Sequence, residues 1–149
     1  MGTLTPPARG TVYVDAQVVI YAVQRHPVYA PVCRPIWEAA RAQSDRVVSS
    51  ELALIETLVA PLRDGDAILR ARFETFLLHS DTRLLPVTQD ILREGARLRA
   101  SMPALKTPDA IHAATALLYG CSLFVSNDRG FRAVPGLPLA LLDDVLAAP

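Results

Sequence analysis

Four acidic residues lie beside apolar segments of the chain, and they are the groups best placed to do chemistry. They are Asp15, Glu56, Asp109 and Asp128. Asp15 directly follows the apolar run TVYV, and Asp128 comes just after SLFVSN. Both runs read as strands, and open α/β sheets bind ligands at the carboxyl ends of their strands. Taken singly, each Asp has a simpler interpretation as a turn or helix-cap residue.

Glu56 lies within an expected helix over residues 50–62. The spacing of Leu52, Ile55 and Val59 predicts the buried face of that helix, and Glu56 falls on or beside it. A glutamate is rarely buried without a partner. Position alone leaves two interpretations open, a functional acid and an edge glutamate paired with an arginine.

Asp109 stands in the first turn of an expected helix, where the helix dipole alone favours an acid. That helix is apolar nearly all round, so its N-terminus is expected close to the sheet. If the four carboxylates meet there, they repel one another, and few basic residues lie beside them in the sequence. A divalent cation offsets that charge, and oxygen ligands select Mg²⁺ or Mn²⁺ over zinc. Such an ion activates water and clamps phosphate oxygens, which is the chemistry of phosphodiester hydrolysis.

The elements that must position these acids alternate along the chain. Strands are expected at 11–14, 46–49, 83–87, 122–126 and 139–142, and helices at 16–24, 31–43, 50–62, 66–79, 88–101 and 107–119. The sequence Thr107-Pro108-Asp109 predicts a helix capped by Thr107, and Gly120 predicts its end. This alternation predicts an α/β fold, a three-layer α/β/α sandwich with a mainly parallel sheet.

Length and composition set the outer limits. A chain of 149 residues with 51% hydrophobic residues predicts one domain over 11–149, after a flexible lead-in at 1–10. The formal net charge of zero argues against a protein that coats nucleic acid through a global basic field. No apolar run is long enough for a membrane span, so no membrane partner is expected. Cys33 and Cys121 read as buried thiols of a cytoplasmic protein.

Three segments together resemble a known family. They are VYVDAQVVIYAV, SSELALIETL and TPDAIHAATALLYGCSLFVSNDRGF. Their order and spacing resemble the PIN-domain ribonucleases, most closely the VapC toxins of bacterial and archaeal toxin–antitoxin pairs. Each motif is weak alone, but together they cover the chain from Val12 to about Leu142.

The resemblance implies a function and a set of partners. The family's acidic cluster falls on the four acids named above, which in the family hold one or two Mg²⁺ or Mn²⁺ ions and cleave single-stranded RNA, often tRNA or ribosomal RNA. Ser126 and Asn127 match the turn that shapes the metal site. The resemblance also implies a homodimer and a cognate antitoxin protein that lies in a groove of the toxin.

The chain departs from the family pattern at three positions beside the acids. Ala16 and Gln17 replace the usual hydroxyl residue and the usual Asn or Ser of the first motif. Gly130 stands where many members carry a further acid. The departures leave open a non-catalytic PIN-like module that binds RNA or protein. A phosphatase or a phospho-receiver domain fits less well, because the phosphatase pattern wants a second Asp at position 17.

Three other polar residues are candidates for supporting roles. His112 follows Asp109 by three residues and is expected to be a core histidine that orients Asp109, with a general acid as the alternative. Arg129 and Lys106 are possible RNA contacts, although a surface ion pair is an equal interpretation for Arg129. The four acids predict metal-dependent phosphodiester hydrolysis, and the resemblance implies an endoribonuclease; we expect Glu56 to position the acidic cluster.

Overall fold

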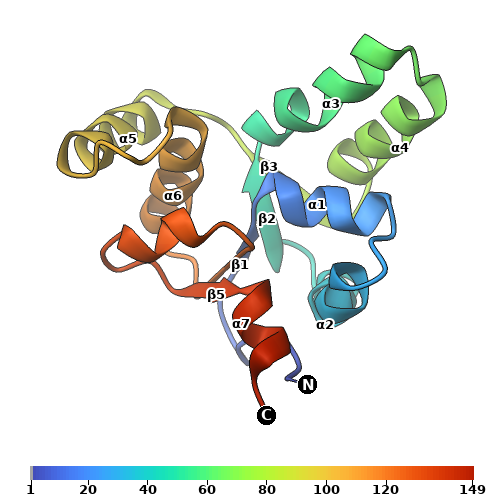
Figure 1. Ribbon diagram of the computed structural model, residues 1–149, viewed down its shortest axis with the longest axis horizontal. Helices are drawn as coiled ribbons and strands as arrows, with labels where there is room; N and C mark the ends of the chain where they lie inside the picture. Colours follow the sequence, from blue (N-terminus) through green and yellow to red (C-terminus); the bar gives the residue numbers. More distant parts are fainter. Residues whose placement is uncertain (1) are drawn as a thin grey trace.

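Short strands alternate with helices along most of the chain, as the sequence predicts (Figure 1). The computed structural model describes residues 2–149, so Met1, the first residue of the expected lead-in, lies outside the described residues. The strands are β1 (Val12–Val14), β2 (Val47–Ser50), β3 (Thr82–Leu85), β4 (Leu123–Ser126) and β5 (Leu139–Leu141). The helices are α1 (Ala16–Val23), α2 (Tyr29–Ala42), α3 (Leu52–Asp64), α4 (Ala67–Leu78), α5 (Gln89–Ser101), α6 (Thr107–Tyr119) and α7 (Leu142–Ala147), with a 3₁₀ turn, η1 (Arg129–Ala133).

The described strands form a parallel sheet in the order β3-β2-β1-β4-β5. The chain builds outward from β1 to β3 and then returns to place β4 on the other side of β1. Ligands of open α/β sheets bind beyond the strand ends at such a reversal of strand order. Asp15 directly follows β1 and Asp128 comes two residues after β4, so these two acids flank the reversal.

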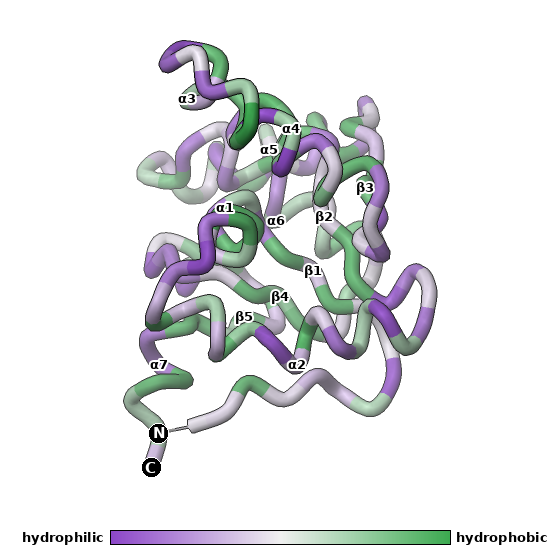
Figure 2. Tube along the Cα trace, turned by 90° about the vertical axis from the view of Figure 1, so that its right-hand side faces the viewer, coloured by the Kyte–Doolittle hydropathy of each residue, from purple (hydrophilic) through white to green (hydrophobic). Residues whose placement is uncertain are grey.

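Helices cover both faces of the sheet, which gives the predicted three-layer sandwich (Figure 1). The pleat of β1 sends alternate side chains to opposite faces. Val12 and Val14 pack with α1, α2 and α4, whereas Tyr13 packs with α5 and α6. All three are 0% exposed. Figure 2 shows the apolar strands running through the centre of the molecule.

Helix α3 presents a different face to the core from the one that the sequence predicts. Its buried residues are Ala53, Thr57 and Pro61, whereas Ile55 and Val59 are 62% and 53% exposed. The helix is apolar on two sides, and the side with small residues is the one that packs. Helices α3 and α4 form a hairpin that stands out from the sheet (Figures 1 and 2). Ile55, Val59 and Leu62 are exposed, whereas Leu54 and Leu58 pack against the core.

Several local signals near helix ends are confirmed. Asp66 and Thr88 each accept a hydrogen bond from a backbone N–H of the helix that follows. Helix α6 ends before Gly120, whose φ of 72° lies in the left-handed region. The predicted cap Thr107 is wrong by one residue, because Lys106 has the extended backbone of an N-cap and Thr107 is already helical.

The segment before β1 has no helix or strand among its described residues, yet part of it packs on the domain. Leu4 is 3% exposed, and the Arg46 guanidinium donates hydrogen bonds to the carbonyls of Pro7 and Gly10. Cys33 and Cys121 are buried and free, as predicted. Of the helices in residues 2–149, none has both the length and the apolar character that crossing a membrane requires.

Candidate functional site

A cavity of about 680 Å³ opens at the reversal of strand order, and the four predicted acids all line it. Its lining residues are Asp15, Ala16, Gln17, Ile20, Tyr21, Glu56, Asp109, His112, Asn127, Asp128, Arg129 and Asp143. They come from α1, α3, α6, α7 and the turn after β4. Segments that are far apart in the sequence therefore contribute carboxylates to one space.

Asp15 lines the cavity, and hydrogen bonds to both of its carboxylate oxygens fix its side chain. It is the N-cap of α1, and its Oδ1 accepts a hydrogen bond from the Val18 N–H at 3.1 Å. Its Oδ2 accepts one from the Ser126 hydroxyl at 2.5 Å. Asp15 is 6% exposed, and burial raises the pKa of its carboxyl despite these bonds.

Ser126 links two of the acids. Besides donating to Asp15, its hydroxyl oxygen accepts a hydrogen bond from the Asp128 N–H at 3.0 Å. Asp128 in turn accepts one from the Gly130 N–H at 2.8 Å and so begins the 3₁₀ turn. The fully buried Ser126 therefore fixes the turn after β4 against the residue that follows β1.

Asp109 stands in the first turn of α6 and lines the same cavity. Burial raises the pKa of its carboxyl, and the negative charge of Asp128 raises it further. The charges of Asp15 and Glu56 act in the same direction. The four acids are thus close enough to repel one another, and among the described residues none of them forms an ion pair with Arg or Lys.

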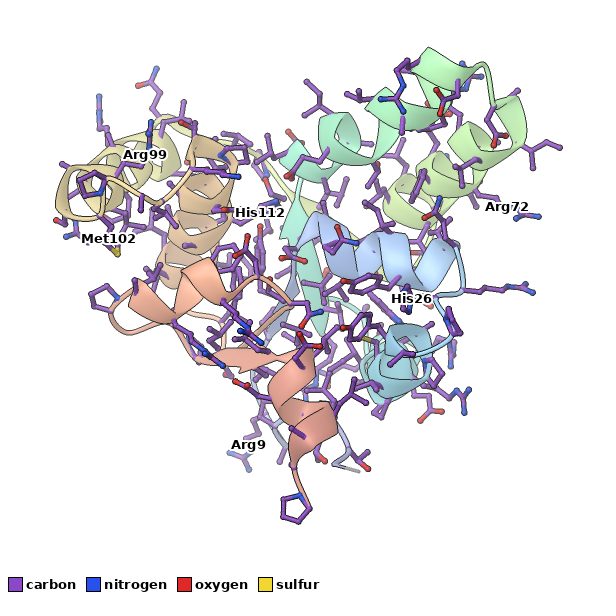
Figure 3. The ribbon with its side chains drawn as sticks, viewed as in Figure 1. Arg9, His26, Arg72, Arg99, Met102 and His112 are labelled. Atoms are coloured by element: carbon purple, nitrogen blue, oxygen red, sulfur yellow. The ribbon has the colours of Figure 1, made fainter. Side chains whose placement is uncertain are left out.

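His112 contacts Glu56 and not Asp109, so the expectation that it orients Asp109 is wrong. Its Nε2 lies 2.5 Å from Glu56 Oε1, and its Nδ1 lies 2.6 Å from the Tyr13 hydroxyl. Figure 3 shows His112 between α6 and the strands. Helical spacing placed Asp109 and His112 on neighbouring positions, but the His112 ring is 1% exposed and reaches inward to partners from other elements.

Asp143 is a fifth acid in the lining that the sequence analysis missed. It follows β5 by two residues, so it lies at the carboxyl end of a strand, as Asp15 and Asp128 do. Its carboxylate accepts a hydrogen bond from the Tyr29 hydroxyl at 2.6 Å, and its N–H donates to Asn127 Oδ1 at 3.0 Å. Applying the strand-end argument to the fifth predicted strand would have found it.

The two basic candidates differ in their placement. Arg129 lines the cavity and is exposed. Lys106 is exposed at the start of α6 and does not line the cavity. Ala16 and Gln17 both line it, so these departures from the resembled family fall at the site itself.

The four acids of this cavity suit a hard divalent cation, because they offer carboxylate oxygens and, among residues 2–149, none of them forms an ion pair with Arg or Lys. Each carboxylate oxygen has two acceptor positions, so the hydrogen bonds of Asp15 and Asp128 leave room for a ligand. Within residues 2–149, no three His, Cys, Asp or Glu side chains are already close enough to hold one ion. An ion held by three of these acids would require their side chains to move closer together.

Solved structures with this fold include proteins of toxin–antitoxin systems. VapBC2 from Rickettsia felis, bound to a DNA fragment from its promoter, superposes with a TM-score of 0.70 at 16% identity, covering 88% of this chain and 98% of that chain. VapC20 of Mycobacterium tuberculosis, a Sarcin-Ricin loop cleaving toxin, has a TM-score of 0.67 at 17% identity, covering 83% and 94%. DNA-bound VapBC from Salmonella typhimurium has a TM-score of 0.66 at 17% identity, covering 90% and 99%.

Comparison with known sequences gives a match to a family but not to an individual protein. No curated protein matches this chain. The PIN domain family model matches residues 12–137, which span β1 to the end of the turn before β5 and include all four predicted acids. The chain therefore belongs to the PIN-domain family.

Proposed function

We propose that this protein is a divalent-metal-dependent endoribonuclease and the toxin of a toxin–antitoxin pair, acting in the cytoplasm. The observation that carries the proposal is the cavity at the reversal of strand order, with Asp15, Glu56, Asp109 and Asp128 on its walls and no Arg or Lys ion pair to any of them in the described residues. Family membership and the likeness to VapBC proteins support the same activity.

Asp15, Asp109 and Asp128 are the proposed ligands of Mg²⁺ or Mn²⁺, with Glu56 completing the cluster directly or through a water. When bound, such an ion activates water and stabilises the charge on a phosphate oxygen. Ser126 holds Asp15 and the Asp128 turn in fixed register, so these two ligands need little reorganisation. His112 forms a hydrogen bond with Glu56, and both residues line the cavity. Arg129, which lines the cavity and is exposed, is the proposed contact to a neighbouring RNA phosphate.

Cleavage of purified total tRNA and ribosomal RNA tests this proposal. We expect products from the wild-type protein with Mn²⁺ and none from the Asp128→Asn variant at the same concentration. Asp90→Asn is the matched control, because Asp90 is an exposed acid on α5 and does not line the cavity. If Asp128→Asn and the wild-type protein cleave equally, the activity does not come from this cavity; if neither cleaves, the protein is a non-catalytic PIN-like module.

The exposed apolar stripe of α3 supports the proposed homodimer. Ile55, Val59 and Leu62 lie on one side of the helix and are each more than half exposed. We expect Val59→Asp to raise the dimer dissociation constant at least about tenfold, because a charge in the centre of an apolar interface is costly. Sedimentation equilibrium measures it. Leu78→Asp, the same kind of change at an exposed position of α4, is the control.

Two adjoining grooves support an antitoxin partner. One of about 740 Å³ lies between α1 and α4, and one of about 470 Å³ lies along α1 and α2. Arg25, Arg34, Arg41 and Arg72 line them, and the described residues pair none of these with an acid. His26 and Arg72 mark this side of the molecule in Figure 3. An acidic antitoxin segment with apolar side chains suits these grooves. A small DNA-binding protein encoded next to this chain, which binds it and blocks cleavage, is the expected partner.

A further inference from the structure

Tyr13 is a fully buried polar residue that the proposed mechanism does not use. It is the middle residue of β1 and is 0% exposed. Its ring stacks on Phe124 with centroids 5.0 Å apart and planes at 4°, which fixes the direction of its hydroxyl. That hydroxyl lies 2.6 Å from His112 Nδ1. The side chain therefore connects the centre of the sheet with a residue that lines the cavity.

The two contacts of His112 determine which ring nitrogen carries the proton. Nε2 lies 2.5 Å from a carboxylate oxygen of Glu56, and an ionised carboxylate only accepts hydrogen bonds. Nε2 must therefore carry the hydrogen. In the neutral ring Nδ1 is then an acceptor, and the Tyr13 hydroxyl is the donor that it faces.

We propose that Tyr13 is a positioning residue that fixes His112 as the Nε2–H tautomer and thereby holds Glu56 in place at the cavity. The series runs through three elements, from Tyr13 on β1 to His112 on α6 to Glu56 on α3. Glu56 needs such a contact because its long side chain has several rotatable bonds and is 27% exposed. It also lies on α3, a helix that stands out from the sheet (Figure 1). The expected effect of Tyr13 on RNA cleavage rests on the function proposed above. The expected tautomer of His112 does not depend on that function.

The first test is the tautomer itself in the metal-free wild-type protein. Two-dimensional ¹⁵N–¹H correlation of the imidazole rings distinguishes a protonated nitrogen from an unprotonated one. We expect His112 to show a protonated Nε2 and an unprotonated Nδ1, and His26, which is partly exposed and has different partners, to serve as an internal reference. A protonated Nδ1 in His112 overturns the proposal. No cleavage assay is needed, so failure here and failure of the proposed function are separate results.

The second test removes only the hydroxyl. In Tyr13→Phe we expect His112 to populate a mixture of tautomers, and kcat for RNA cleavage to fall about tenfold with KM unchanged, as is usual when the partner of a ligand-holding residue is removed. Thr57→Val is the matched control, because it also removes a buried hydroxyl but one bonded to its own helix. An unchanged His112 tautomer in Tyr13→Phe, or an equal loss of kcat in Thr57→Val, overturns the proposal.

Discussion

Asp109→Asn is expected to abolish cleavage while making the metal-free protein more stable. The loss of activity should be at least about 100-fold, because metal-mediated charge stabilisation is worth several kcal/mol and each 1.36 kcal/mol is tenfold in rate. The gain in stability follows from burial of the Asp109 charge and, second, from its repulsion by neighbouring acids. Burial and then the charge of Asp128 raise the pKa of Asp109, which means that its ionised form is disfavoured in the folded state.

The pH dependence of this effect has a defined sign. A carboxyl whose pKa is higher in the folded than in the unfolded protein binds more protons when folded, so stability falls as pH rises between the two values. Above the folded pKa the full destabilisation is present, and it is relieved as pH falls toward the unfolded value. Thermal melts of metal-free protein should therefore give a Tm a few degrees higher for Asp109→Asn at pH 7, with the difference shrinking toward pH 4.

The matched control for this prediction is Asp90→Asn. Its carboxylate is exposed and lies 3.6 Å from Arg93 on the surface of α5, so both activity and Tm should stay close to wild type. An Asp109→Asn protein that is folded and cleaves normally would remove Asp109 from the mechanism. A lower Tm in Asp109→Asn at pH 7 would show that its carboxylate stabilises the metal-free fold, contrary to the repulsion inferred here.

Removal and restoration of the metal ion are expected to produce the second large effect, which changes both RNA cleavage and thermal stability. Excess EDTA should reduce cleavage to background, and Mn²⁺ or Mg²⁺ should restore it, because the ion offsets carboxylates that, in the described residues, form no ion pair with Arg or Lys. An ion that binds only the folded state stabilises it by about 2.7 kcal/mol at 100 times its Kd. Differential scanning calorimetry with and without Mn²⁺ measures this gain as a rise in Tm.

Asp15→Asn gives the comparison that makes the metal experiment specific. Asparagine keeps the size of the side chain and can still accept the Val18 N–H bond, but it removes one negative charge from the cavity. We expect the Mn²⁺-induced rise in Tm to be largely lost in this variant. An equal rise in both proteins would place the bound ion elsewhere, and no rise in the wild type would favour a non-catalytic PIN-like module.

The positions of Asp15 and Asp128 could be predicted because they depend only on strand ends and topology. A β-branched or aromatic run followed by Asp needs little tertiary information, and a parallel sheet brings its strand ends to one edge. The same reasoning covers Asp143, which was missed because it was not applied to the last strand. The position of Asp109 could also be predicted, because the first turn of a buried helix must lie near the sheet.

The orientation of α3 and the partner of His112 could not be predicted, because both depend on packing between distant elements. Helix α3 has apolar residues on two sides, and the sequence does not say that the side with Ala53 and Thr57 meets the core. His112 is three residues from Asp109, but its contacts with Tyr13 and Glu56 span 99 and 56 positions of sequence. Helical spacing identifies neighbours on one helix and gives no information about contacts of that length.

Paramagnetic broadening by Mn²⁺ tests most directly whether these carboxylates share an ion. The chain has three histidines, and His112 lines the cavity while His26 and His79 do not. Small additions of Mn²⁺ to the wild-type protein should broaden the His112 imidazole signals first, then those of His26, whose ring packs on the cavity-lining Tyr21, and leave those of His79 sharp. Equal broadening of all three, or broadening of His112 that persists in an Asp15→Asn, Asp109→Asn double variant, would contradict the account.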